Sequence, residues 1–107
     1  MPLIAWLTFL AAAVLEVGGD AIIRRGLRGR SVILVAAGFA ALGSYGILVN
    51  LVRWDFSRLI GVYVGVFAVA AVLAGKFIFR EAIPASTWVG LAVIILGGLI
   101  IQFGHGR

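Results

Sequence analysis

Two carboxylates lie four residues apart in the stretch Ala11–Gly26, which is apolar apart from them and two arginines at its end. The two acids are Glu16 and Asp20. On a helix, residues at i and i+4 share a face, so both acids are expected to point the same way. An apolar environment disfavours the charged form of a carboxyl group and lets it hold a proton, while an arriving cation favours the ionised form. We therefore predict that Glu16 is the functional centre, with the properties that a proton-coupled cation carrier needs.

Each acid also has a structural alternative. Glu16 could be protonated and hydrogen-bonded at a packed helix interface, since acids within membranes are functional as a rule but not by necessity. Asp20 lies nearer the end of the stretch, where an ion pair with Arg24 or Lys76 is the favoured interpretation. As a second acid along a transport path, Asp20 would instead suit a dication such as a polyamine.

Four further residues are candidates to surround Glu16. Gly19 shares its polar helix face, and Ser44 and Tyr45 are placed to hydrogen-bond it from a neighbouring helix. The ring of Tyr63 could form an aromatic wall for a cation, because aromatic faces attract quaternary ammonium groups. Packing between helices is the alternative role for this ring. The predicted proton and substrate site therefore includes all four residues.

The composition is that of an integral membrane protein. Of 107 residues, 64% are hydrophobic and 12% charged, whereas soluble domains average about 45–50% and about 25%. About 20 apolar residues span a bilayer, and four such runs occur, at about 3–23, 32–52, 59–79 and 86–103. These runs predict an all-α, multi-pass protein of the plasma (inner) membrane, with four transmembrane helices in a single domain, 1–107.

Small residues predict where helices approach one another. Gly61 and Gly65 form a GxxxG pair in the third run, typical of close helix packing or a hinge. Gly90 and Gly97 are seven residues apart in the fourth run, and this spacing is typical of a helix–helix seam. No polar side chain interrupts that run before Gln102. The fourth helix is therefore expected to form a homodimer interface.

Charged residues are confined mostly to the connections. The formal net charge is +5, and basic residues between spans indicate topology signals and lipid-headgroup contacts, not nucleic-acid binding. Their distribution predicts that the first and third connections lie in the cytoplasm. The chain has no cysteine, and no catalytic triad, paired histidines or phosphate-binding loop can be assembled. We therefore expect no enzyme activity, cofactor or metal.

The chain resembles the small multidrug resistance family, the four-span branch of the drug/metabolite transporter superfamily. The resemblance runs from Leu15 to Gln102. Its motifs are Leu15-Glu16-Val17 followed by Arg24, Tyr63-Val64-Gly65, Phe79-Arg80-Glu81-Ala82-Ile83, and Gly90 with Gly97. Each motif is short, but their order and spacing together are specific.

The resemblance implies a homodimer, antiparallel in characterised cases, that exports organic cations such as quaternary ammonium compounds in exchange for protons. One Glu16 from each subunit would share a central chamber. Gly19 stands where guanidinium exporters carry Trp, which favours the broad-specificity branch. Export of guanidinium or of a polyamine is one alternative. A flippase-like or accessory subunit is a second, because Ile60 stands where the family usually has a site-lining Tyr. The third alternative is a non-transporting membrane assembly protein in which Glu16 has a structural role.

Overall fold

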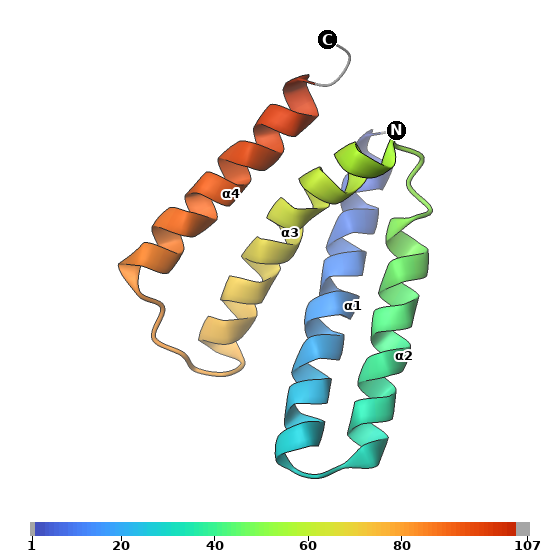
Figure 1. Cartoon of the computed structure of the whole chain (residues 1–107), viewed down its shortest axis with the longest axis vertical. Coiled ribbons are helices and arrows are strands. Elements are labelled where there is room, and N and C mark those ends of the chain that lie inside the picture. Colours follow the sequence, from blue (N-terminus) through green and yellow to red (C-terminus); the bar gives the residue numbers. More distant parts are fainter. Residues whose placement is uncertain (1, 105–107) are drawn as a thin grey trace. The chain divides into compact units, whose positions relative to one another are not determined.

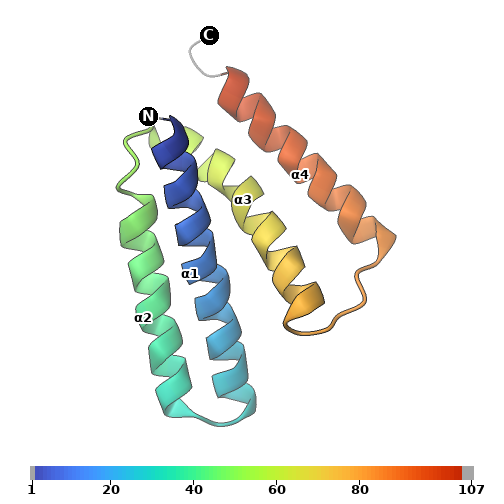
Figure 2. The ribbon, with the colours of Figure 1, turned by 180° about the vertical axis from the view of Figure 1, so that it is seen from behind.

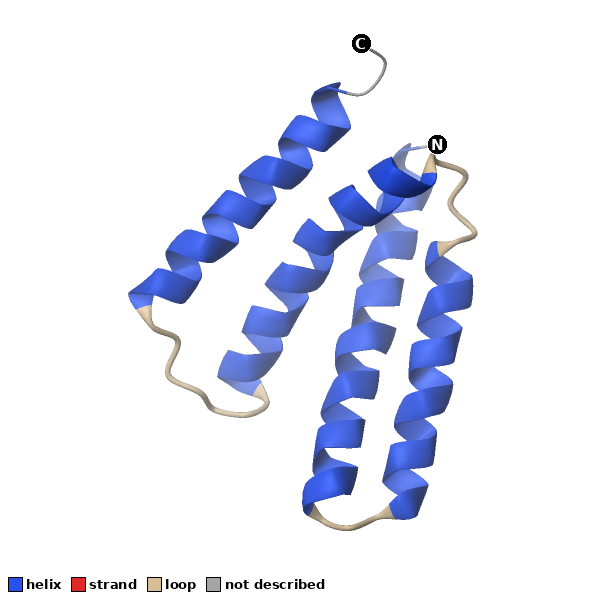
Figure 3. Cartoon of the chain, in the orientation of Figure 1, coloured by secondary structure: helices blue, strands red, loops and turns tan. Residues whose placement is uncertain are grey.

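The computed structural model describes residues 2–104 as four helices in sequence (Figure 1). They are α1 (Pro2–Arg28), α2 (Val32–Val49), α3 (Phe56–Phe77) and α4 (Ala85–Gly104). Figure 3 shows only helices and their connections in this part of the chain. All four are long and apolar enough to cross a membrane. The shortest, α2, has 18 residues and is about 27 Å long at 1.5 Å per residue. The prediction of an all-helical chain with four membrane-length helices is confirmed.

The first connection begins later than the apolar run predicts. α1 continues past residue 23 to Arg28, because basic side chains are favourable in the last turn of a helix. The helix ends at Arg28, the backbone of Arg30 is left-handed with φ 55°, and Ser31 N–H donates to the Gly26 carbonyl at 2.8 Å. The Ser31 hydroxyl then accepts from Leu34 N–H at 3.2 Å and caps α2.

The remaining helix ends also differ from those that hydropathy predicts. α2 stops at Val49, short of the predicted residue 52, and the Asn50 side-chain amide donates to the Gly46 carbonyl at 2.7 Å. α3 starts at Phe56 instead of 59, after the N-cap residue Asp55. α4 starts directly after Pro84, a residue that suits the beginning of a helix.

The chain divides into two compact units, Met1–Arg53 and Trp54–Arg107. Each is a helical hairpin and is described here by itself. In the first hairpin, α1 and α2 run antiparallel and side by side, as two opposite views show (Figures 1 and 2). Large apolar side chains on their outer faces are exposed, among them Leu7, Leu10, Val14, Phe39 and Ile47. Such a surface fits a hydrocarbon environment.

The first hairpin is closed by glycines on both helices. A Cβ atom on Gly26 would lie 2.9 Å from the Val35 backbone nitrogen, and one on Gly19 would lie 3.0 Å from Leu42 Cγ. A Cβ atom on Gly38 would clash with the Ile23 side chain and lie 2.8 Å from the Gly19 carbonyl oxygen. The two backbones therefore approach as closely as glycine allows. These residues define what we call the α1–α2 seam.

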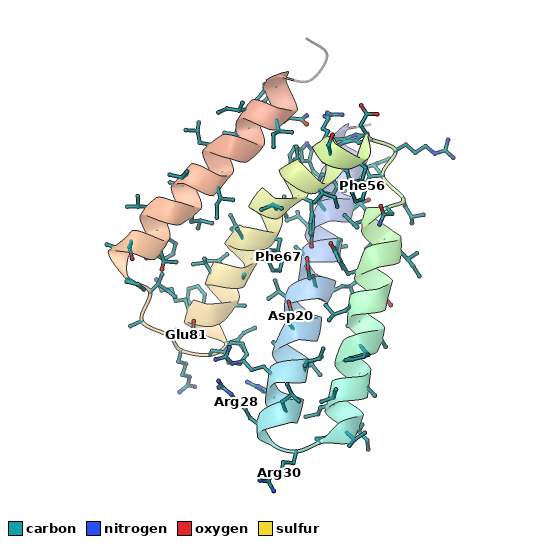
Figure 4. All side chains as sticks on the ribbon, viewed as in Figure 1. Asp20, Arg28, Arg30, Phe56, Phe67 and Glu81 are labelled. Atoms are coloured by element: carbon teal, nitrogen blue, oxygen red, sulfur yellow. The ribbon has the colours of Figure 1, made fainter. Side chains whose placement is uncertain are left out.

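The second hairpin is held at its two ends. Near the start of α3, a Cβ atom on Gly61 would lie 2.7 Å from Ile101 Cδ1 of α4. At the other end, Lys76 Nζ lies 5.6 Å from the centroid of the Trp88 ring, and Gly75 packs against the side chain of Glu81. Figure 4 shows Glu81 in the connection between α3 and α4.

Candidate functional site

Glu16 lies on the α1–α2 seam. The contacts of α1 with α2 are made by Gly26, Ile23 and Gly19, at alternating steps of three and four residues. The next step along this face is Glu16, which is half-buried. One turn earlier, Ala12 is 0% exposed and Ala13 1% exposed. The seam thus places a single carboxylate between tightly packed glycines on one side and a fully buried apolar turn on the other.

Tyr45 is the residue of α2 that faces Glu16. On α2 the contacting residues are Val35, Gly38 and Leu42, and the same alternation of steps leads to Tyr45 and then to Val49, which is 1% exposed. Tyr45 is half-buried, and the Glu16 carboxylate acts electrostatically on its phenol group. The two polar side chains of the seam are therefore neighbours.

This pair combines three properties that an organic cation needs. A carboxylate supplies the opposite charge, an aromatic ring supplies a face that attracts cations, and a phenol supplies a hydrogen-bond donor or acceptor. Both side chains are only partly buried, so they are accessible to a proton or a small ligand. Among residues 3–104, no charged side chain is fully buried. The pair therefore presents a partly exposed carboxylate beside an aromatic ring and a hydroxyl group.

The other predicted residues of the first hairpin take different positions. Gly19 packs against Leu42 and Gly38, so its Cα faces the neighbouring helix. Ser44 is exposed, and its hydroxyl donates to the Ala40 carbonyl of the same helix at 2.9 Å. Asp20 is exposed one turn after Glu16 (Figure 4). Its role, in an ion pair or in transport, stays a prediction.

Small residues of α2 at four-residue spacing do not mark its contact with α1. Ala36, Ala40 and Ser44 are all exposed, and the close approach is made by Gly38. The better sequence signal is on α1, where small residues recur every seven positions and all are buried: Ala5, Ala12, Gly19 and Gly26. This repeat, with Glu16 between its second and third members, identifies the seam face.

The remaining predicted residues belong to the second hairpin. Tyr63 is 2% exposed, and its ring centroid lies 6.4 Å from that of Phe67, one turn further along α3. Of the predicted packing pair, Gly61 contacts Ile101, whereas a Cβ atom on Gly65 would meet nothing within 4 Å. The aromatic pair is compatible with either of the roles predicted for Tyr63.

Gly90 and Gly97 lie on an open face of α4. A Cβ atom on either would meet nothing within 4 Å. Beside them runs an exposed apolar stripe at alternating steps of four and three residues, Val89, Val93, Leu96, Ile100 and Phe103. Within the described chain, α4 therefore presents an uncovered apolar face that contains small residues seven apart.

Among the described residues, no group of three or more His, Cys, Asp or Glu side chains is placed to hold a metal ion. The carboxylate of Glu16 has a tyrosine, not a second acid, as its neighbour on α2. Hard metal cations are bound by several oxygen ligands, which usually include more than one carboxylate.

Comparison with protein families gives a match over residues 2–107. The matching model is described as "Uncharacterised BCR, YnfA/UPF0060 family". The chain belongs to the YnfA/UPF0060 family. Members of this family are named as membrane proteins in several bacteria, in agreement with the four membrane-length helices.

Relatives match this YnfA/UPF0060 chain over nearly its whole length. The UPF0060 membrane protein YfjF of Bacillus subtilis is 35% identical over 96% of both chains. A UPF0060 membrane protein of Mycolicibacterium gilvum is 34% identical over 91% of this chain and 92% of its own. One from Pseudomonas paraeruginosa is 30% identical over 95% of both. No solved structure matches the chain.

Proposed function

We propose that this YnfA/UPF0060 protein is a proton-coupled exporter of small or hydrophobic organic cations, such as quaternary ammonium compounds, in the inner (plasma) membrane. Glu16 binds a proton and the substrate cation in alternation. The observation that carries the proposal is the placement of Glu16 on a glycine-rich seam of a membrane-length hairpin, with the phenol of Tyr45 as its neighbour. The sequence motifs that resemble the small multidrug resistance family support the same function.

The coupling follows from the cost of a bare charge in the membrane. A carboxylate near the bilayer centre costs about 2.5–3.5 kcal/mol on insertion scales. A protonated Glu16, or a Glu16 paired with a cation, avoids most of that cost. Only these two loaded forms therefore change sides readily, and a proton gradient is thereby coupled to cation movement in the opposite direction.

The working unit in this proposal is a homodimer, and an antiparallel pair is favoured by the family resemblance. The uncovered face of α4, with Gly90 and Gly97 in open surroundings, supports a second copy as the partner. Small residues let backbones approach, as they do along the α1–α2 seam. Two subunits would supply two Glu16 carboxylates to one transport path.

The decisive experiment measures proton movement in proteoliposomes after addition of a quaternary ammonium, guanidinium or a polyamine. We expect a substrate-dependent proton flux for the wild type and at least a tenfold loss in Glu16→Gln. Asp20→Asn is the matched control, because it also converts an acid to an amide on α1 but at an exposed position. It should keep the flux with quaternary ammonium within about threefold.

Each outcome selects one function. Flux with guanidinium or the polyamine alone would move the assignment to those exporters, and loss of polyamine flux in Asp20→Asn would make Asp20 a second substrate ligand. No flux with any of the three cations would reject the exporter. If Glu16→Gln then also loses the dimer on size-exclusion chromatography, Glu16 is a structural residue.

A further inference from the structure

The second hairpin holds a half-buried arginine between its two helices. Arg58 is in the first turn of α3, and its Nη2 donates a hydrogen bond to Gln102 Oε1 of α4 at 2.9 Å. The guanidinium carbon also lies 3.8 Å from the centroid of the Trp54 ring. Stacking and hydrogen bonding together fix the orientation of the planar guanidinium group. The side chain is thus held in place and not free to extend into solvent.

The described chain satisfies only some of the hydrogen-bond donors of the Arg58 guanidinium group. A guanidinium has five N–H donors and no acceptor. Within the described chain, Arg58 Nε is buried and has no hydrogen-bond partner, and Gln102 accepts from only one of the terminal nitrogens. A buried donor without a partner is unfavourable, and the terminal nitrogens keep N–H donors beyond the one that Gln102 accepts.

A pocket of about 400 Å³ lies beside this arginine. It is lined by Ser57, Arg58, Ile100, Ile101 and Gly104. One side therefore carries a cation and a hydroxyl, and the other carries two large aliphatic side chains of α4 that are exposed. Asp55, the acid of the same connection, is exposed and is not part of the lining. The pocket suits a molecule with an anionic head and an apolar tail.

We propose that this pocket binds an anionic phospholipid, independently of the proposed transport function. Arg58 and the Ser57 hydroxyl bind the phosphodiester oxygens, and an acyl chain lies along Ile100 and Ile101. Arginine binds phosphate through parallel N–H donors, and Arg58 lies in the first turn of α3, at the end of a membrane-length helix where lipid headgroups lie. The exposed aliphatic lining favours a lipid over free phosphate, which has no apolar part to bury.

Such a lipid connects the two helices of the hairpin. α3 contributes Ser57 and Arg58, and α4 contributes Ile100 and Ile101. The phosphate and the acyl chain of one molecule would therefore contact both helices at the end where Arg58 already bonds to Gln102. Binding at this end is expected to stabilise the association of α3 with α4 by mass action.

The test measures lipid binding by native mass spectrometry of the detergent-purified full chain. The probes are phosphatidylglycerol, phosphatidylcholine and inorganic phosphate. We expect phosphatidylglycerol to bind at least tenfold more tightly than phosphatidylcholine, and Arg58→Gln to abolish this preference. Arg53→Gln is the matched control, since it removes an equal charge from an exposed residue of the same connection. It should retain the preference within about twofold.

A second variant avoids any disturbance of the helix contact. Ser57→Ala removes only an exposed hydroxyl, leaves the Arg58–Gln102 bond intact, and should weaken phosphatidylglycerol binding about two- to fivefold. Equal loss in Arg53→Gln and Arg58→Gln would show nonspecific charge attraction and overturn the proposal. It would likewise be overturned if inorganic phosphate displaced the lipid at equal concentration, or if Ser57→Ala and wild type bound equally.

Discussion

Glu16 of α1 and Tyr45 of α2 are neighbours across a helix seam whose other contacts are made by glycines and aliphatic side chains. The carboxylate acts on the phenol from within the same hairpin. The seam brings the two helix backbones close together and fixes which residues oppose each other. Backbone packing therefore decides that Tyr45, and not the adjacent Ser44, lies on the same seam as Glu16.

Removal of the phenol oxygen should weaken transport moderately. Polar interactions between membrane helices average about 0.6 kcal/mol, equivalent to about a threefold change, so Tyr45→Phe should lower cation-coupled proton flux in proteoliposomes two- to fivefold. Ser44→Ala is the control, because the Ser44 hydroxyl bonds to the Ala40 carbonyl on its own helix. A larger loss in Ser44→Ala than in Tyr45→Phe would contradict the site described here.

The seam should not tolerate a methyl group at Gly38. The added Cβ would meet Ile23 and the Gly19 carbonyl oxygen, and overpacking typically costs about 1–3 kcal/mol. Gly38→Ala should therefore lower the midpoint of thermal unfolding in detergent, followed by circular dichroism. Gly43→Ala on the same helix has open space around its Cβ and should be neutral or slightly stabilising, since alanine favours helix. Equal midpoints would argue against the close approach.

The dimer proposed through α4 can be separated from folding of the subunit. A Cβ atom at Gly97 meets nothing within the chain, so Gly97→Val should leave the subunit folded but reduce dimer formation at least tenfold, measured by light scattering or cross-linking in lipid. Gly43→Val is the control, because Gly43 is similarly open but lies on α2. Retention of the dimer in Gly97→Val would place the interface elsewhere.

Substitution by glycine should change the stability of the chain in opposite directions at two arginines near the end of α1. Arg30 has φ 55°, a conformation that costs a residue other than glycine about 1–2 kcal/mol. Arg30→Gly should therefore stabilise the chain by about 0.5–1 kcal/mol. Arg24→Gly, four residues before the end of α1, should destabilise it by a similar amount. Denaturant titration in detergent measures both, and destabilisation by Arg30→Gly would refute the account.

The sequence predicted the helices well because each apolar run is long and its ends are marked by charge. It placed the helix ends less accurately, because hydropathy does not register the capping bonds of Ser31 and Asn50. Basic residues that end an apolar run also favour continuation of the helix, as at Arg28.

Of the candidate site, the sequence predicted Glu16, Ser44 and Tyr45, but it could not decide which of Ser44 and Tyr45 lies on the seam with Glu16. The two are adjacent, and only the pairing of α1 with α2 decides which one faces the acid. Gly19 was assigned to the polar face because of its position near Glu16, whereas its packing against Leu42 depends on a neighbouring helix. The fixed orientation of Arg58 likewise depends on Gln102, 44 positions away in the sequence.

The location of Glu16 and Tyr45 within one hairpin has a consequence for biosynthesis. If α1 entered the bilayer alone, its carboxylate would lack the tyrosine that accompanies it in the folded chain. Entry of α1 and α2 together, joined by a short connection with Arg30 at the hairpin end (Figure 4), brings acid and phenol into hydrocarbon as a pair. The hairpin is thus a suitable unit of membrane insertion.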